Sequence, residues 1–97
     1  MKPKKVILDK LIEEQSLLKK EYQDKTIGIF GSYARDEQTE TSDVDVLVEF
    51  ESPIGFFKFM KLEDYLSEKL GLKVDLVTPD ALKPLIKSNI LEETVYA

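Results

Sequence analysis

The sequence predicts an α/β domain in which helices pack on a three-stranded sheet, with the elements in the order αβαβαβα. Two observations lead to this fold class. Three short runs rich in β-branched and aromatic residues have the length and composition of strands. Around and between them, longer stretches repeat apolar residues every three or four positions, which is the period of an α-helix. The alternation of the two kinds of segment indicates helices that share one sheet.

The first third of the chain predicts a long helix, a strand and a short helix. Apolar residues recur at helical spacing over residues 5–23, while Lys and Glu fall largely between them. Residues 26–30 form a β-branched and aromatic run that predicts the first strand. Gly31 ends this run, and Ser32 is expected to cap a short helix that continues to about residue 36.

The second strand is expected over residues 43–50, after a polar loop at 37–42. Side chains alternate between the two faces of a strand. The alternation places Val44, Val46 and Val48 on one face and Asp43, Asp45 and Leu47 on the other.

The remainder predicts a turn at 52–55, a helix at 56–70, a strand at 73–77 and a last helix. Gly71 is placed to end the first of these helices, and Pro84 to open the second at its first position. The first helix presents a core stripe of Phe59, Leu62, Leu66 and Leu70. The last helix is expected to direct Leu85, Ile86 and Ile90 inward.

The chain length predicts one domain that spans residues 1–97. With 42% hydrophobic and 34% charged residues, the composition is that of a folded globular protein. A core of this size stabilises a fold only modestly, so association into a homo- or hetero-oligomer is favoured.

The chain contains no cysteine and no histidine. This excludes disulfides, thiolate and histidine metal sites, cysteine nucleophiles and histidine general bases within the sequence. Acid–base chemistry therefore falls to carboxylates, Lys or Tyr.

The net charge of −5 argues against direct nucleic-acid binding, which depends on Lys and Arg to displace counterions. No apolar run approaches the ~20 residues of a membrane span. The basic N-terminus is followed by an amphipathic stretch rather than by the apolar centre of a secretion signal. A cytoplasmic protein without a membrane partner is therefore expected.

The pair Gly31-Ser32 predicts a phosphate-binding turn, because it follows a strand and begins a helix. Such a turn offers free backbone N–H groups and a hydroxyl to phosphate oxygens. Glycine lets the backbone approach the ligand closely. Arg35, one helical turn later, is a candidate for the same phosphates, with a simple ion pair to Asp43 or Glu49 as the alternative.

Asp43, Asp45 and Asp75 are the candidate metal ligands and catalytic residues. Asp43 and Asp45 lie one residue apart on the same face of the second strand, and Asp75 lies in the third strand. If these strands are neighbours, the three carboxylates converge beside Gly31-Ser32, and two Mg²⁺ ions would relieve their repulsion. This is the arrangement for in-line displacement at a nucleoside triphosphate. Because apolar residues flank Asp75, burial of an idle charge there would be costly, which favours a function.

Gly31-Ser32, ten intervening residues and Asp43-Val44-Asp45, with a later strand aspartate at Asp75, resemble the DNA polymerase β nucleotidyltransferase superfamily. The whole chain resembles its minimal nucleotidyltransferases (MNT), usually encoded beside a HEPN-domain protein. The resemblance implies a mixed three-stranded sheet, with Asp43 and Asp45 at both metals and Asp75 at the acceptor hydroxyl. It also implies an antitoxin that transfers AMP from ATP to a tyrosine of a HEPN toxin, a ribonuclease.

The chain departs from the larger relatives in two respects. It lacks the helical domain that grips nucleobase and acceptor, and Asp36 and Glu37 follow Arg35 where many relatives carry Gly. Two other functions therefore stay open: an antitoxin that acts by binding alone, and a nucleotidyltransferase for a small molecule or an RNA end. Four bulky residues within Phe56–Met60 exceed what one helix can bury, so the surplus is a candidate partner surface.

Overall fold

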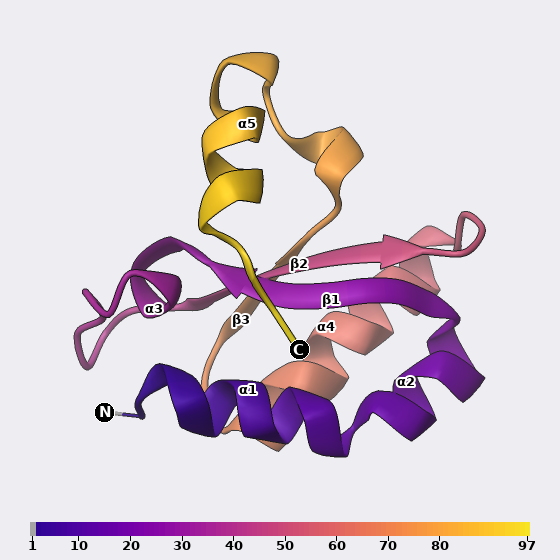
Figure 1. Ribbon diagram of the computed structural model, residues 1–97. Helices are drawn as coiled ribbons and strands as arrows, with labels where there is room; N and C mark the ends of the chain where they lie inside the picture. The colour runs from indigo at the N-terminus through magenta and orange to yellow at the C-terminus, as the bar shows by residue number, and fades with distance from the viewer. Residues whose placement is uncertain (1) are drawn as a thin grey trace.

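Four strands form one mixed sheet in the computed structural model, which describes residues 2–97 (Figure 1). The strands are β1 (Asp24–Phe30), β2 (Val44–Phe50), β3 (Val74–Val77) and β4 (Val95–Tyr96), in the spatial order β3-β2-β1-β4. β1 runs antiparallel to β2 and β4, whereas β2 and β3 are parallel. The predicted α/β class and the three predicted strands are confirmed, and β4 is an addition.

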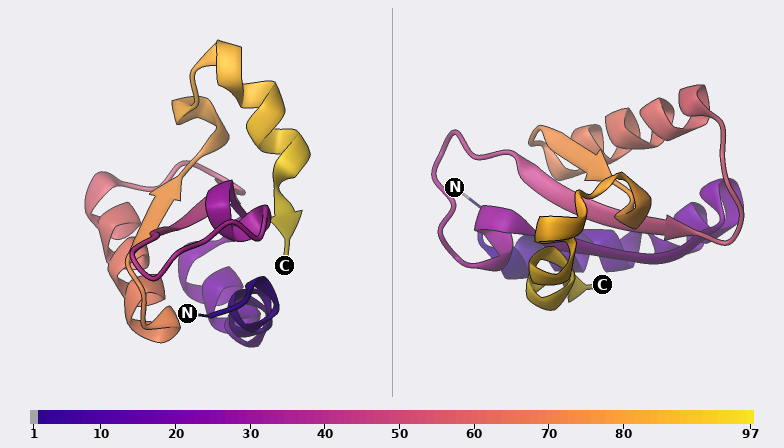
Figure 2. Two further views of the ribbon diagram at one scale, coloured as in Figure 1. Left: turned by 90° about the vertical axis from the view of Figure 1, so that its left-hand side faces the viewer. Right: turned by 90° about the horizontal axis from the view of Figure 1, so that it is seen from above.

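The helices are α1 (Lys4–Glu13), α2 (Gln15–Tyr22), α3 (Gly31–Ala34), α4 (Phe56–Leu70) and α5 (Pro84–Glu93), with a 3₁₀ turn, η1, at Pro79–Ala81. α1, α2 and α4 cover one face of the sheet, whereas α5 stands on the other side (Figures 1 and 2). The core between the three helices and the sheet contains Ile7, Leu11, Leu18, Ile27, Ile29, Val44, Val46, Val48, Leu62 and Leu66. No helix within residues 2–97 is long and apolar enough to cross a membrane.

The single helix predicted over residues 5–23 is two helices, because the chain bends at Glu14 between α1 and α2. The Glu14 carboxylate accepts a hydrogen bond of 2.7 Å from the Tyr65 hydroxyl of α4. Leu11 before the bend and Leu18 after it are both fully buried. The apolar repeat therefore continues through the bend, and the sequence pattern could not reveal it.

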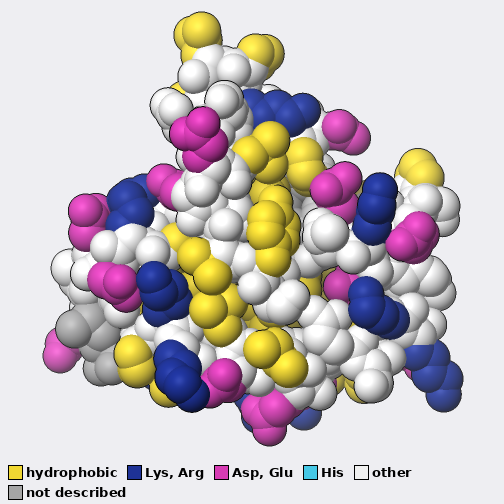
Figure 3. All heavy atoms as spheres, in the orientation of Figure 1, with side chains coloured by type: hydrophobic (Ala, Val, Ile, Leu, Met, Phe, Trp, Pro, Cys, Tyr) yellow, Lys and Arg dark blue, Asp and Glu magenta, His cyan; other side chains and the backbone are white. Residues whose placement is uncertain are grey.

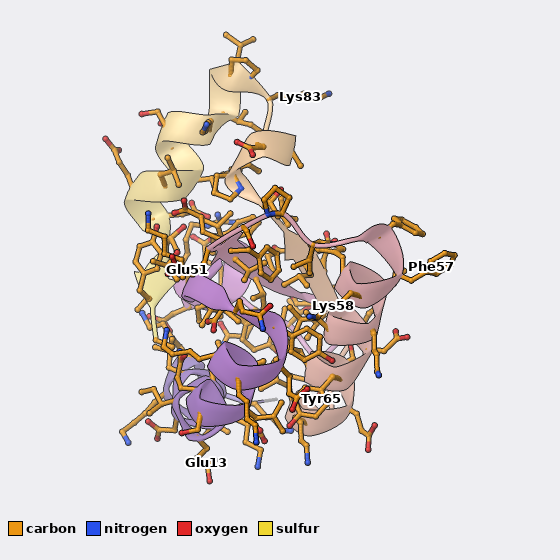
Figure 4. The ribbon with its side chains drawn as sticks, turned by 90° about the vertical axis from the view of Figure 1, so that its right-hand side faces the viewer. Glu13, Glu51, Phe57, Lys58, Tyr65 and Lys83 are labelled. Atoms are coloured by element: carbon orange, nitrogen blue, oxygen red, sulfur yellow. The ribbon has the colours of Figure 1, made fainter. Side chains whose placement is uncertain are left out.

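α4 matches its predicted range, and its C-terminus is fixed by Gly71. Gly71 adopts φ 67°, the left-handed conformation that glycine takes at little cost, and its N–H donates to the Ser67 carbonyl at 2.9 Å. At the other end, Phe56 and Phe57 are 71% and 87% exposed. Figure 4 shows Phe57 directed away from the body of the molecule. The predicted surplus of bulky side chains on this helix is thus confirmed.

α5 begins with Pro84 as predicted, but its predicted burial is wrong. Leu85 is 93% and Ile86 46% exposed, and Ile90 is only half-buried. The reason is the direction of the helix, which rises away from the sheet so that only its last turn approaches the other elements (Figure 1). Figure 3 shows hydrophobic side chains at the end of α5 that projects from the molecule; we call this projecting helix the α5 arm.

Candidate active site

The candidate site lies where β1 ends and β2 and β3 begin, beside α3 (Figure 2). Asp45 on β2 stands opposite Phe30 on β1 and, on its other side, opposite Asp75 on β3. Residues directly opposite in a sheet point to the same face, and neighbouring strands are about 4.8 Å apart. Asp45 and Asp75 therefore share the face that α1, α2 and α4 leave uncovered. The predicted neighbourhood of the second and third strands is confirmed, and it brings Asp45 and Asp75 together.

Gly31 brings the backbone directly against Asp45. Its φ of 73° is in the left-handed region, and a Cβ atom there would lie 2.2 Å from Asp45 Oδ2. A side chain at this position would thus occupy the space of the carboxylate. The absence of a side chain at residue 31 is what allows the turn and the Asp45 carboxylate to adjoin.

Ser32 is half-buried and lies one residue inside α3, so the prediction that it caps this helix is wrong. Phe30 occupies the N-cap position, and no side chain caps the helix. The difference arises because Gly31 already has helical hydrogen bonding: its carbonyl accepts the Arg35 N–H at 3.1 Å. The following residue Tyr33 is 2% exposed and packs in the core.

Burial and neighbouring charge raise the pKa of Asp45 to about 6. Desolvation is the largest cause, followed by the negative charges of Asp75 and Asp43, and Arg35 opposes them. The repulsion follows from the proximity of Asp75 and Asp43 to this carboxyl group. Asp43 itself is exposed and lies 3.9 Å from the ammonium group of Lys73.

Asp75 is exposed, so the expectation that its charge is buried among apolar neighbours is wrong. β3 is an edge strand of the sheet, and Asp75 lies on the face opposite the core. Its neighbours Val74 and Leu76 point to the opposite, core face, where they are buried. The sequence pattern identified the strand correctly but not which of its faces is open.

Within residues 2–97, no three acidic side chains form a ready-made cage for a cation. The donor set nevertheless fits Mg²⁺, since carboxylate oxygens are the hard ligands this ion prefers. The raised pKa of Asp45 shows carboxylates that repel one another, a situation that a bound cation relieves. The aspartates therefore fit a divalent cation that binds on an open face of the sheet.

A cavity of about 700 Å³ lies elsewhere. It is at the other ends of β2 and β3, where Phe50, Phe59 and Leu76 line it together with the 52–54 loop. The candidate site is a surface site rather than a deep cavity. A group on another macromolecule can reach it from solvent.

Arg35 forms ion pairs, but with neither of the two predicted acids. Its Nε donates to Glu37 Oε1 at 2.9 Å, and its Nη1 lies 3.1 Å from both carboxylate oxygens of Glu93. The hydrogen bonds that the guanidinium group donates, first to Glu37 and then to Glu93, raise its pKa. Glu93, at the end of α5, is a site residue that sequence reasoning missed, because no local motif marks it.

Comparisons with known proteins identify the family of this chain. Residues 8–97 match the nucleotidyltransferase domain family. A Methanocaldococcus jannaschii protein named "putative protein adenylyltransferase" is 53% identical over 97 residues, which cover 99% of each chain. The Thermococcus cleftensis "protein adenylyltransferase MntA" is 51% identical over 72 residues, which cover 74% of this chain and 73% of that protein.

Two solved structures extend the comparison. A structure described as a "putative minimal nucleotidyltransferase" matches with a TM-score of 0.82 at 29% identity, over 97% of this chain and 95% of that one. A "tri-AMPylated Shewanella oneidensis HEPN toxin in complex with MNT antitoxin" matches in fold, with a TM-score of 0.68 at 19% identity, over 96% of this chain and 70% of that one. With the family match over residues 8–97, these similarities show that the chain belongs to the nucleotidyltransferase domain family, among the minimal nucleotidyltransferases.

Proposed function

We propose that this nucleotidyltransferase moves AMP from ATP to a tyrosine hydroxyl of a HEPN-domain toxin and thereby acts as an antitoxin. One observation carries the proposal: Asp45 and Asp75 are paired in register beside Gly31, whose missing side chain makes room for the Asp45 carboxylate. This is the juxtaposition of acidic groups and a phosphate-binding turn that nucleotidyl transfer requires.

Each side chain has a role that follows from its position. The Gly31 N–H and the Ser32 hydroxyl donate to phosphate oxygens, and Arg35 adds a charged donor one helical turn later. Asp43 and Asp45 would hold two Mg²⁺ ions, and Asp75 would hold the one nearer the acceptor. When bound, these ions supply neutralisation of the triphosphate charge and activation of the acceptor hydroxyl. The acceptor hydroxyl would give up its proton to solvent, and its oxygen would bond to the α-phosphorus as the bond from that phosphorus to pyrophosphate breaks.

AMP and a protein acceptor are favoured by the relatives and by the openness of the site. The two curated relatives above are named protein adenylyltransferases. In the similar Shewanella complex, the toxin bound to the MNT antitoxin is AMPylated. The aspartates here lie on an uncovered sheet face that a tyrosine of a partner can approach, and the net charge of −5 disfavours an RNA acceptor.

The test is intact-mass spectrometry of a HEPN-domain partner co-expressed with this protein. The partner is expected to gain one or more AMP increments with the unaltered protein and none with the double variant Asp43→Asn/Asp45→Asn. Asp64→Asn is the matched control, since Asp64 is exposed on α4, outside the site, and its variant should leave the increments unchanged.

Two results would replace the proposal with its alternatives. A partner that stays unmodified and is still neutralised by both the unaltered protein and the double variant would identify an antitoxin that acts by binding alone. Labelling of an RNA end or a small molecule, without binding of the HEPN partner, would identify a nucleotidyltransferase with a different acceptor.

A further inference from the structure

The carboxylate of Glu93 binds the backbone N–H that opens the phosphate-binding turn. Glu93 Oε2 accepts a hydrogen bond of 2.5 Å from the Gly31 N–H. Both of its oxygens also lie 3.1 Å from Nη1 of Arg35. Glu93 thus joins the last turn of α5 to the first residue of α3, directly after β1.

These two donors are the ones that would bind phosphate. A carboxylate with one oxygen on a backbone N–H and both on a guanidinium uses the contacts that a phosphate group would use. Glu93 is well held there, since its side chain is only 24% exposed. While these bonds persist, the Gly31 N–H has no free direction toward a second anion.

Glu93 holds this position although the site already carries negative charge. Its carboxylate binds the N–H of Gly31, whose backbone also adjoins the Asp45 carboxylate, so two like charges lie beside the same residue. The Gly31 N–H and Arg35 compensate this repulsion. A triphosphate that arrives with its own cations brings the positive charge that Glu93 lacks, so it can take over both donors.

The helix that carries Glu93 is lightly attached. No residue of α5 is buried, and its first turn projects into solvent. After Glu93 the chain continues through Thr94 into β4, whose two residues pair with β1. Release of the carboxylate therefore disturbs little packing.

We propose that Glu93 is a built-in competitor of the nucleotide, which occupies the phosphate-binding position of Gly31 and Arg35 until a triphosphate displaces it. The inference rests on the proposed function, because it takes these groups as the phosphate donors. The apparent nucleotide affinity is then the intrinsic affinity reduced by the fraction of molecules in which Glu93 is released. Glu93 thereby sets the ATP concentration at which the protein becomes active.

The test is calorimetric titration with the non-hydrolysable analogue AMP-PNP and Mg²⁺. Glu93→Gln and Glu93→Ala are expected to bind the analogue on the order of tenfold more tightly than the unaltered protein, since charge-assisted bonds no longer have to be broken. Glu92→Gln is the matched control. It removes the same charge from an exposed neighbour on the same helix and should change affinity little. Circular dichroism verifies that each variant is folded.

A second readout reports the contact itself. The Gly31 amide resonance in ¹H–¹⁵N spectra should move upfield in Glu93→Gln, because a strong hydrogen bond to an anion is lost. Addition of inorganic triphosphate should move the same resonance in the unaltered protein and further in the variant.

The outcomes separate this inference from the function beneath it. The competitor role would be overturned if the unaltered protein binds the analogue and both Glu93 variants bind it equally well or more weakly. The proposed nucleotidyl transfer would then still stand. Weaker binding by the variants would make Glu93 a positioning residue of the site. Absence of analogue binding by all four proteins would overturn the proposed function, and the competitor role with it.

Discussion

The carboxyl group of Asp45 has a pKa raised from 3.8 to about 6. Folding transfers this carboxyl group from water to a half-buried position between other acids. Between about pH 4 and pH 6 the folded protein holds a proton on Asp45 that the unfolded chain has released. Stability without metal is therefore expected to fall as the pH rises through this window.

This gives a prediction for Asp45→Asn in metal-free buffer. The variant is expected to have a higher free energy of unfolding than the unaltered protein at pH 7, by at most about 3 kcal/mol and less where solvent screens the charge. The difference should vanish toward pH 4, where the native carboxyl group is already neutral. Urea denaturation at several pH values measures it, with Asp64→Asn as the control. A difference in unfolding free energy that does not depend on pH would show that folding does not raise the pKa of Asp45.

Asp75→Asn is predicted to separate nucleotide binding from transfer. If Asp75 serves only the cation at the acceptor, its loss should change AMP-PNP affinity little, whereas AMP transfer to the partner should fall by at least ~10²-fold. Asp43→Asn and Asp45→Asn should weaken both. Calorimetry and partner labelling on the same preparations provide the comparison, and normal transfer by the Asp75 variant would rule out the role.

The sequence predicted Gly31, Asp45 and Asp75 as site residues because the residues around each of them have the pattern of a strand or of the end of a strand. It failed where a contact is distant in sequence. Glu93 reaches Gly31 across 62 positions, and its partner Arg35 was expected to pair with acids nearer in the chain. The exposure of Asp75 also depends on strand order, since only an edge strand without a covering helix leaves such a face open.

The turn between β1 and α3 depends on a glycine, which gives a prediction about this element. Gly31→Ala is expected to destabilise the fold by about 1–3 kcal/mol. The positive φ is unfavourable for alanine, and its Cβ would overlap the Asp45 carboxylate. Gly55→Ala is the matched control: Gly55 has φ −71°, and a Cβ atom added there would meet no atom within 4 Å. Thermal unfolding of both variants tests the comparison, and equal melting temperatures would contradict it.

The helices and strands were predictable where an apolar repeat faces the core. α4 and the three longer strands follow such repeats. α5 does not, because its apolar residues obey the helical period while the helix points away from the sheet. β4 has only two residues, too few for any alternation, and it exists because β1 offers an unpaired edge. Both failures concern the path of the chain after β3, which tertiary contacts decide.

The molecule as a whole has one packed face and one functional face. Three helices cover the first, whereas the α5 arm stands on the side of the second (Figure 2). Asp43 and Asp75 are exposed there, and Asp45 is half-buried. The exposed phenylalanines at the start of α4 lie apart from the core, and in Figure 4 Phe57 projects freely. An aromatic side chain in this position is typical of a residue that anchors a partner.

Phe57→Ser is therefore predicted to leave the melting temperature unchanged and to weaken association with the HEPN partner by about tenfold or more. Phe59→Ser is the contrasting variant, since Phe59 packs edge-on against Phe50 with ring centroids 6.4 Å apart and its loss should lower the melting temperature. Partner affinity is measured by surface plasmon resonance with the unmodified partner. Unchanged affinity for Phe57→Ser would place the contact surface elsewhere.

The parallel pairing of β2 and β3 determines which changes in chain length the site can tolerate. Asp45 and Asp75 meet because backbone hydrogen bonds fix their register, and side chains alternate between faces at every residue. One residue inserted between Val44 and Asp45 would move the Asp45 side chain to the opposite face of the strand, where it would point into the apolar core. One residue inserted at Gly55, in the loop beyond the far end of β2, would leave the pairing intact. Homologous chains should therefore vary in length at the loop before α4 while keeping both strands free of insertions.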